Sequence, residues 1–167
     1  AAGHTRYTAA RGLPQLREVI SGFYQQRYGV QIDPRRILIT PGGSGALLLA
    51  TSLLVDPGKH WLMADPGYPC NRHFLRLIEA SAQLVPAGPE VRYQLTPELV
   101  DQCWQADTVG ALIASPANPT GTLLKREELA ALSAAVRARG GHLVVDEIYH
   151  GLTYGVDAAS VLEVDNE

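Results

Sequence analysis

The chain has 167 residues, a formal net charge of −3 at pH 7 and 46% hydrophobic residues. This length suits one domain with a sizeable core, and the slightly acidic balance gives no indication of nucleic-acid binding. No apolar run approaches the roughly 20 residues that span a bilayer, and the N-terminus carries no signal-peptide pattern. Two cysteines, Cys70 and Cys103, are too few for a disulfide scaffold, so the composition predicts a cytoplasmic protein with free thiols.

The first expected elements are a helix and a strand. Pro14 suits the first turn of a helix, and apolar residues follow at spacings of three and four until Gly29 ends it. After a proline-containing turn, Ile37–Thr40 is an expected strand, and an apolar helix is expected over Ala46–Leu54.

A glycine-rich turn, Pro41-Gly-Gly-Ser-Gly45, joins that strand to that helix. Glycines let the backbone come close to an anion, and the unpaired N–H groups of a helix start attract one. Gly42, Gly43 and Ser44, whose hydroxyl adds a donor, are therefore candidate phosphate ligands. The alternative is a glycine turn that serves only a tight strand–helix connection.

The middle of the chain continues the alternation of strands and helices. Trp61–Asp65 is an expected strand that runs into Pro66-Gly-Tyr-Pro69 and a helix, and Gln83–Pro86 is a further short strand. Thr96-Pro-Glu-Leu99 has the N-cap, the first-turn proline and the early acid that begin a helix.

Two stretches near the end of the chain organise the rest. Val109–Ala114 is an expected strand that leads into the loop containing Asn118, and His142–Val145 is an expected strand that ends at Asp146. A surface helix over Glu127–Arg139 separates them, so the two strands should be parallel and bring Asn118 and Asp146 to one carboxyl edge, where open α/β sheets bind ligands. An amide and a carboxylate side by side suit a ring with a phenolic oxygen and a basic nitrogen.

Four segments resemble the class I and II aminotransferases, the fold-type-I family of enzymes that use pyridoxal 5′-phosphate (PLP). They are Asn118-Pro-Thr-Gly121, Asp146-Glu-Ile-Tyr149, Gly42-Gly-Ser-Gly-Ala-Leu47 and Pro66-Gly-Tyr-Pro69. None is decisive alone, but chance does not readily place all four in this order, each at an expected strand end. The resemblance implies an α/β fold with three layers, α-β-α, and a mostly parallel sheet, as in the large domain of these enzymes.

The resemblance also implies a role for each candidate side chain. Asp146 would keep the pyridine nitrogen protonated, and Asn118 and Tyr149 would donate hydrogen bonds to the ring oxygen, with Asp146 and Tyr149 as the catalytic pair. Tyr68 would stack on the ring, and Tyr7 would reach the cofactor phosphate of a neighbouring subunit in a homodimer. The alternatives are a salt bridge for Asp146 and loop-packing aromatics for Tyr68 and Tyr7.

The resemblance stops before the family's Ser-x-x-Lys segment, whose lysine forms the Schiff base with PLP. The two lysines here, Lys59 and Lys125, do not stand in such a motif. Residues 1–167 are therefore expected to be the central part of the PLP-binding large domain, without its N-terminal arm, the lysine segment and the C-terminal small domain. Such a piece is expected to be inactive alone. It is also expected to be unstable, because in the family two further strands lie between the first expected strand here and the strand that ends at Asp146.

The expected function is transfer of an amino group between an amino acid and a 2-oxo acid, with no nucleic-acid or membrane partner. The alternatives are another PLP reaction such as a carbon–sulfur lyase, and a non-catalytic sensing domain of a transcription regulator, because shared cofactor contacts do not determine the reaction. A truncated pseudoenzyme that binds PLP without a lysine is a further alternative. The sequence leaves the substrate amino acid open.

Overall fold

The computed structural model describes residue 3 and residues 6–166. The chain divides into two compact units, with the boundary between Gly42 and Gly43. Each unit is built from elements that the sequence pattern largely predicts, and the second unit contains the sheet.

The first unit contains helix α1 (Pro14–Tyr28) and the short 3-10 helix η1 (Pro34–Arg36). Proline begins α1, and Gly29 ends it in the left-handed conformation with φ 70°, as the pattern predicts. The side chain of Asp33 caps η1 by accepting a hydrogen bond from the Arg35 amide at 2.8 Å.

The expected strand Ile37–Thr40 is not formed, which corrects the prediction of five strands. The segment is irregular, and the amide of Ile39 donates to the carbonyl of Arg11 at 3.1 Å instead of joining a strand ladder. A strand needs a neighbouring extended segment to share its hydrogen bonds, and none of the described segments pairs with this one.

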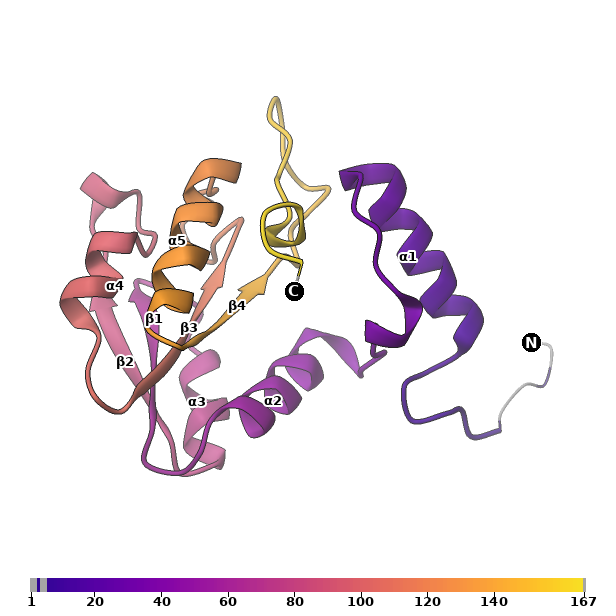
Figure 1. The fold of residues 1–167 in the computed structure, drawn as a ribbon, viewed down its shortest axis with the longest axis horizontal. Helices are drawn as coiled ribbons and strands as arrows, with labels where there is room; N and C mark the ends of the chain where they lie inside the picture. Colours follow the sequence, from indigo (N-terminus) through magenta and orange to yellow (C-terminus); the bar gives the residue numbers. More distant parts are fainter. Residues whose placement is uncertain (1–2, 4–5, 167) are drawn as a thin grey trace. The chain divides into compact units, whose positions relative to one another are not determined.

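Among its described residues, the second unit contains four strands and four helices, with α2 beginning at the boundary residue (Figure 1). The strands are β1 (His60–Asp65), β2 (Ser81–Pro86), β3 (Thr108–Ala114) and β4 (His142–Asp146). The helices are α2 (Gly42–Leu54), α3 (Asn71–Leu77), α4 (Pro97–Cys103) and α5 (Arg126–Ala138), with short 3-10 turns η2 (Pro89–Val91) and η3 (Val161–Glu163). Helix α2 begins four residues earlier than expected, so that the glycine run forms its first turn rather than a loop.

The sheet is parallel throughout and has the strand order β2-β1-β3-β4. One core packs α4 and α5 against one face of the sheet through Leu62, Val100 and Leu132. A second core packs α2 and α3 against the opposite face through Leu47 and Leu75, with Trp61, Met63 and Leu112 from the strands. The unit is therefore a three-layer α-β-α sandwich, as predicted, with α4 and α5 on one side of the strands and α2 and α3 on the other in Figure 1.

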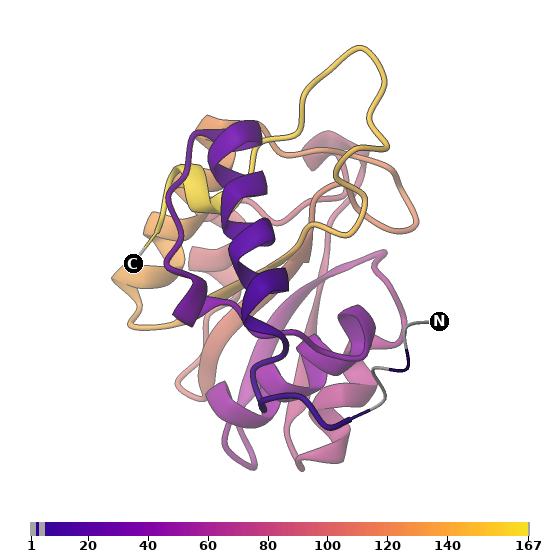
Figure 2. The same cartoon turned by 90° about the vertical axis from the view of Figure 1, so that its right-hand side faces the viewer.

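The carboxyl ends of the strands are where the candidate site residues gather. Ala114 at the end of β3 pairs with Asp146 at the end of β4, and the Ser115 amide extends this ladder by donating to the Asp146 carbonyl at 3.0 Å. The segment after β4 projects beyond the sheet before returning to η3, as both views show (Figures 1 and 2). Within the described part of the chain, no helix has both the length and the apolarity that crossing a membrane requires.

Candidate functional site

Asn118 and Tyr149 meet at the carboxyl edge of the sheet, although 30 residues separate them in sequence. Asn118 lies in the loop after β3, Tyr149 lies three residues beyond the end of β4, and both are half-buried. The Nδ2 atom of Asn118 donates a hydrogen bond to the Tyr149 hydroxyl at 3.2 Å. Asn118 keeps a second N–H and Tyr149 keeps its own O–H, so the pair can donate two hydrogen bonds to one acceptor oxygen.

Asp146 supplies a carboxylate at the same edge. It is the last residue of β4 and is half-buried. Its Oδ1 atom accepts a hydrogen bond from the Ile148 amide at 3.1 Å, which orients the carboxylate at the start of the following turn. The parallel pairing of β3 and β4 therefore brings Asn118, Asp146 and Tyr149 to one edge, as the sequence predicts.

Tyr68 lies on the other side of Asn118, in the loop between β1 and α3. The two residues line one cavity of about 180 Å³ between the ends of β1 and β3, whereas Tyr149 and Asn118 line an adjoining cavity of about 450 Å³. A hydrogen bond with the Cys70 thiol raises the pKa of the Tyr68 hydroxyl, and Tyr149 contributes to the same upward shift. Tyr68 and Asn118 therefore line the same cavity, and the stacking of Tyr68 on a planar ligand stays a prediction.

The glycine-rich turn forms the N-terminus of α2. Gly42 has φ 75°, a left-handed conformation that favours glycine, and an added Cβ at Gly43 would lie 3.9 Å from Ile148 Cδ1. Gly43 therefore lies next to the Ile148 side chain, in the turn that follows Asp146. Ser44 is exposed and lines a separate cavity with residues of α3.

Tyr7 belongs to the first unit, where its side chain is fully exposed. Its expected contact with a cofactor in a neighbouring subunit stays a prediction. The grouping that the structure provides in the second unit therefore consists of Tyr68, Asn118, Asp146 and Tyr149.

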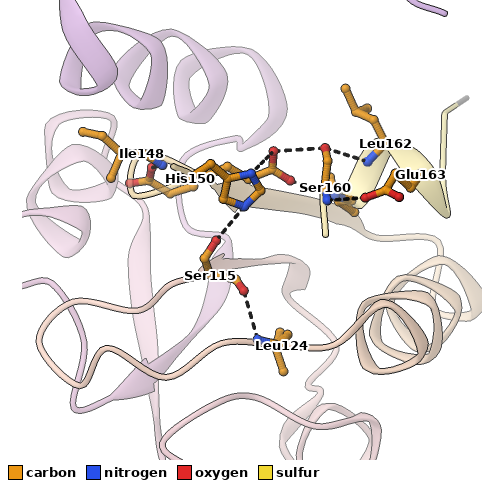
Figure 3. A network of polar contacts seen from close by, with 10 residues as sticks. Ser115, Leu124, Ile148, His150, Ser160, Leu162 and Glu163 are labelled. Atoms are coloured by element: carbon orange, nitrogen blue, oxygen red, sulfur yellow. Dashed lines mark hydrogen bonds and ion pairs between the residues drawn. The ribbon is translucent and has the colours of Figure 1, made fainter. Parts of the chain in front are cut away.

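A polar network beside this group is the feature that sequence reasoning missed (Figure 3). Glu147 accepts hydrogen bonds from Ser160 Oγ at 3.0 Å and from the Val161 amide at 2.7 Å. His150 lies 3.7 Å from Glu147 through Nδ1, and its Nε2 atom is 3.0 Å from the Ser115 carbonyl. No sequence signal connects Glu147 to Ser160, which lies 13 residues further along the chain.

The donor set fits the ring that the sequence predicts. Two N–H or O–H groups from Asn118 and Tyr149 match a phenolic oxygen, and the Asp146 carboxylate matches a basic ring nitrogen. Tyr68 offers a flat face, and the N–H groups at the start of α2 suit a phosphate. Among the described residues, no group of three or more His, Cys, Asp or Glu side chains could hold a metal ion.

Comparison with known proteins gives one consistent result. The family model described as aminotransferase class I and II matches residues 2–167. The valine–pyruvate aminotransferase of Mycobacterium tuberculosis is 41% identical over 148 residues, which cover 89% of this chain and 38% of that protein. A crystal structure of an aminotransferase from M. tuberculosis matches with a TM-score of 0.92 and 37% identity, covering 98% of this chain and 45% of that one. The structure of Thermus thermophilus aspartate aminotransferase with maleate matches with a TM-score of 0.91 and 29% identity. The match covers 97% of this chain and 42% of that one. The chain thus spans less than half the length of these relatives.

Proposed function

Since the chain belongs to the class I and II aminotransferase family, we propose that its protein transfers an amino group between an amino acid and a 2-oxo acid with PLP as cofactor. The observation that carries this proposal is the hydrogen-bonded pair Asn118–Tyr149 beside the Asp146 carboxylate, at the ends of two neighbouring parallel strands. Bound PLP supplies the electron sink that lets a proton leave the Cα atom of the amino acid.

Each side chain then has a defined task. Asp146 holds a proton on the ring nitrogen, because a nearby anion stabilises the protonated form. Asn118 and Tyr149 donate to the ring oxygen and fix the orientation of the ring, and Tyr68 covers one of its faces. Their shared contribution is orientation and electrostatics, which is what a protein adds to the chemistry of a cofactor.

The phosphate belongs, in this proposal, at the N-terminus of α2. Gly42 and Gly43 let the backbone approach closely, and Ser44 adds a hydroxyl donor to the unpaired N–H groups of the first turn. Tyr7 would complete this site from a second subunit, which makes a homodimer part of the proposal.

Residues 1–167 correspond, in the same proposal, to the central part of the cofactor-binding large domain of the longer relatives. The lysine that attaches PLP would then belong to a region of the relatives beyond the matched part, and residues 1–167 alone would be inactive. A cytoplasmic location suits the two free cysteines.

The test is an amino-transfer assay on the protein in its natural full length, loaded with PLP. Valine with pyruvate and aspartate with a 2-oxo acid are the first substrate pairs, because they correspond to the names of the relatives. Asp146→Asn should lower the transfer rate on the order of 100-fold, the effect of removing one preorganised electrostatic contact. Asp157→Asn, at an exposed carboxylate in the loop after β4, is the matched control and should leave the rate unchanged. A PLP-loaded protein that transfers no amino group, or an Asp146→Asn variant with full activity, would contradict the proposal.

A further inference from the structure

Gln94 is a buried polar side chain outside the four segments that resemble the aminotransferase family. It lies in the loop between η2 and α4 and is 2% exposed. Its Nε2 atom donates hydrogen bonds to the main-chain carbonyls of Ala114 and Thr122, both at 3.1 Å. Carbonyl oxygens only accept, so the side-chain amide presents its two N–H groups to them. Gln94 thereby joins the last residue of β3 to the far side of the loop that carries Asn118.

Asn118 belongs to a turn that closes on the carbonyl of Thr122. The Ala117 amide donates to the Thr122 carbonyl at 2.9 Å, and the Gly121 amide donates to the Ala117 carbonyl at 2.8 Å. The Thr122 carbonyl oxygen has two lone pairs, and it accepts from both the Ala117 amide and the Gln94 side chain. Gln94 therefore fixes the point at which the turn that carries Asn118 closes.

A second buried contact lies just outside this turn. Ser115 Oγ accepts a hydrogen bond from the Leu124 amide at 3.0 Å, and the two residues are 1% and 3% exposed (Figure 3). This contact joins the two ends of the loop to each other. Gln94 has a different effect, because it anchors the loop to a segment that lies outside it.

The segment that presents Gln94 has a strained backbone. Arg92 and Tyr93 have φ values of 54° and 59°, in the left-handed region that residues with a side chain seldom adopt. Such conformations persist only where the surrounding structure holds them, and they cluster at functional sites. Here the Arg92 guanidinium donates to the Leu123 carbonyl at 3.1 Å and forms an ion pair with Glu128 of α5. The strained segment is thus bonded to the same loop on its exposed side through Arg92 and on its buried side through Gln94.

We propose that Gln94 is a positioning residue, which holds Asn118 in place for its hydrogen bond with Tyr149 before a pyridoxal-type cofactor binds. This inference rests on the proposed function and adds a residue to the same site. Gln94 lines the cavity of about 180 Å³ that Tyr68 and Asn118 share. Because two carbonyls already use its N–H groups, Gln94 acts on the ring oxygen of the ligand through the loop. Ordering the loop in advance strengthens binding, since the ligand then has less ordering to impose.

The experiment measures the affinity of the full-length apoprotein for two probes. Pyridoxamine 5′-phosphate carries the ring oxygen and binds without a covalent link to a lysine, and its 3-deoxy analogue lacks only that oxygen. Quenching of protein fluorescence gives the Kd for each probe. The proteins compared are wild type, Gln94→Met and Gln102→Met. Methionine keeps the length of the glutamine side chain but has no N–H donor, and Gln102 is an exposed glutamine of α4 that serves as the matched control.

Wild type should bind pyridoxamine 5′-phosphate more tightly than the 3-deoxy analogue. In Gln94→Met, the Kd for pyridoxamine 5′-phosphate should rise roughly two- to tenfold, the range for one hydrogen bond, while the Kd for the analogue should change less than about twofold. Gln102→Met should follow wild type with both probes.

The two probes separate positioning from a general effect on the fold. If Gln94→Met loses equal affinity for both probes, or loses none, this inference is overturned and the proposed function stands. A wild-type protein that binds the two probes equally well, or binds neither, would overturn the proposed roles of Asn118 and Tyr149 together with this inference.

A measurement on the wild-type protein alone covers the case of a variant that does not fold. Hydrogen exchange reports on the amides of Ala117 and Gly121, whose hydrogen bonds close the turn. In the apoprotein, both amides should exchange at least about tenfold more slowly than in an unstructured chain, and pyridoxamine 5′-phosphate should slow them little further. Amides that exchange freely in the apoprotein and become protected only with the probe would refute a loop that is held in advance.

Discussion

Ser115→Ala tests whether the loop that carries Asn118 is held by the buried contacts described above. The substitution removes one hydroxyl and adds no volume, so it isolates the hydrogen bond from Leu124 N–H to Ser115 Oγ at 3.0 Å. The backbone bonds of Ser115 to Asp146 and His150 do not involve the deleted atom and are retained.

The expected cost follows from burial. Leu124 is 3% exposed and Ser115 is 1% exposed, so water does not readily reach the amide that loses its acceptor. An unsatisfied buried donor costs about 1–3 kcal/mol, compared with about 0.5–1.5 kcal/mol for an average hydrogen bond that water can replace. We therefore expect Ser115→Ala to lower the free energy of unfolding by about 1–3 kcal/mol.

Urea denaturation of the full-length protein measures this difference through the midpoint at constant slope. The matched control is Ser52→Ala, because Ser52 is an exposed serine of α2 whose hydroxyl donates to Leu48 O at 2.7 Å. Loss of the Ser52 hydroxyl should change the free energy of unfolding by no more than about 0.5 kcal/mol, because alanine favours the helix and water can still reach the Leu48 carbonyl. If Ser115→Ala also changes the free energy of unfolding by no more than about 0.5 kcal/mol, the view that the Ser115 hydroxyl anchors the loop is refuted.

Four further predictions concern packing, pH and the completeness of the chain. Gly110→Ala should lower the free energy of unfolding by about 1–3 kcal/mol or prevent folding, because an added Cβ would lie 2.4 Å from the His142 carbonyl oxygen and 2.5 Å from Trp61 Nε1. Gly22→Ala lies in α1, where the added Cβ would meet no described atom within 4 Å beyond the local helix backbone, so it should instead raise the free energy of unfolding by about 0.5–1 kcal/mol, as urea midpoints would show. Hydrogen bonds from Arg35 lower the pKa of Asp33 from 3.8 to about 2, so its contribution to stability is complete above pH 3.8 and is lost as pH falls through 2. Carboxyl NMR should find that midpoint, and Arg35→Gln should return it toward 3.8. Residues 1–167 alone should show no cooperative thermal transition by circular dichroism, and a sharp one would contradict this expectation.

The elements that local sequence determines were predicted well. Helix α1 is specified by a proline at its start and a glycine after its end. Helix α4 is specified by Thr96, whose side chain accepts a hydrogen bond from the Leu99 amide, as expected of an N-cap. The placement of Asn118 and Asp146 at one edge also follows from the sequence, because parallel strands joined by a helix place their carboxyl ends together.

The Glu147–His150 network shows what local pattern cannot supply. Its partners, Ser115 and Ser160, are 35 residues upstream and 10 residues downstream of His150, and serine has no periodic or motif signal that distinguishes these two from any other. A histidine without ligand spacing therefore gave no indication of its contact with a carbonyl. Such contacts depend on how the loops fold back over the sheet, which is a property of tertiary structure.

The strand predicted over Ile37–Thr40 did not form, and residues 1–167 alone are expected not to unfold cooperatively. Both have the same physical basis, which is backbone groups that lack a neighbouring strand. β4 has the composition of a central strand, because Leu143 and Val145 pack against the α4–α5 face while Val144 packs against the α2–α3 face. In the described part of the chain, β4 is nevertheless an edge strand that pairs with β3 alone, and Ile37–Thr40 forms no ladder. An apolar edge strand leaves N–H and C=O groups unpaired where proteins normally place charges or a cover. A further strand that pairs with the open edge of β4 would satisfy these groups, which is why we expect residues 1–167 to need one for cooperative folding.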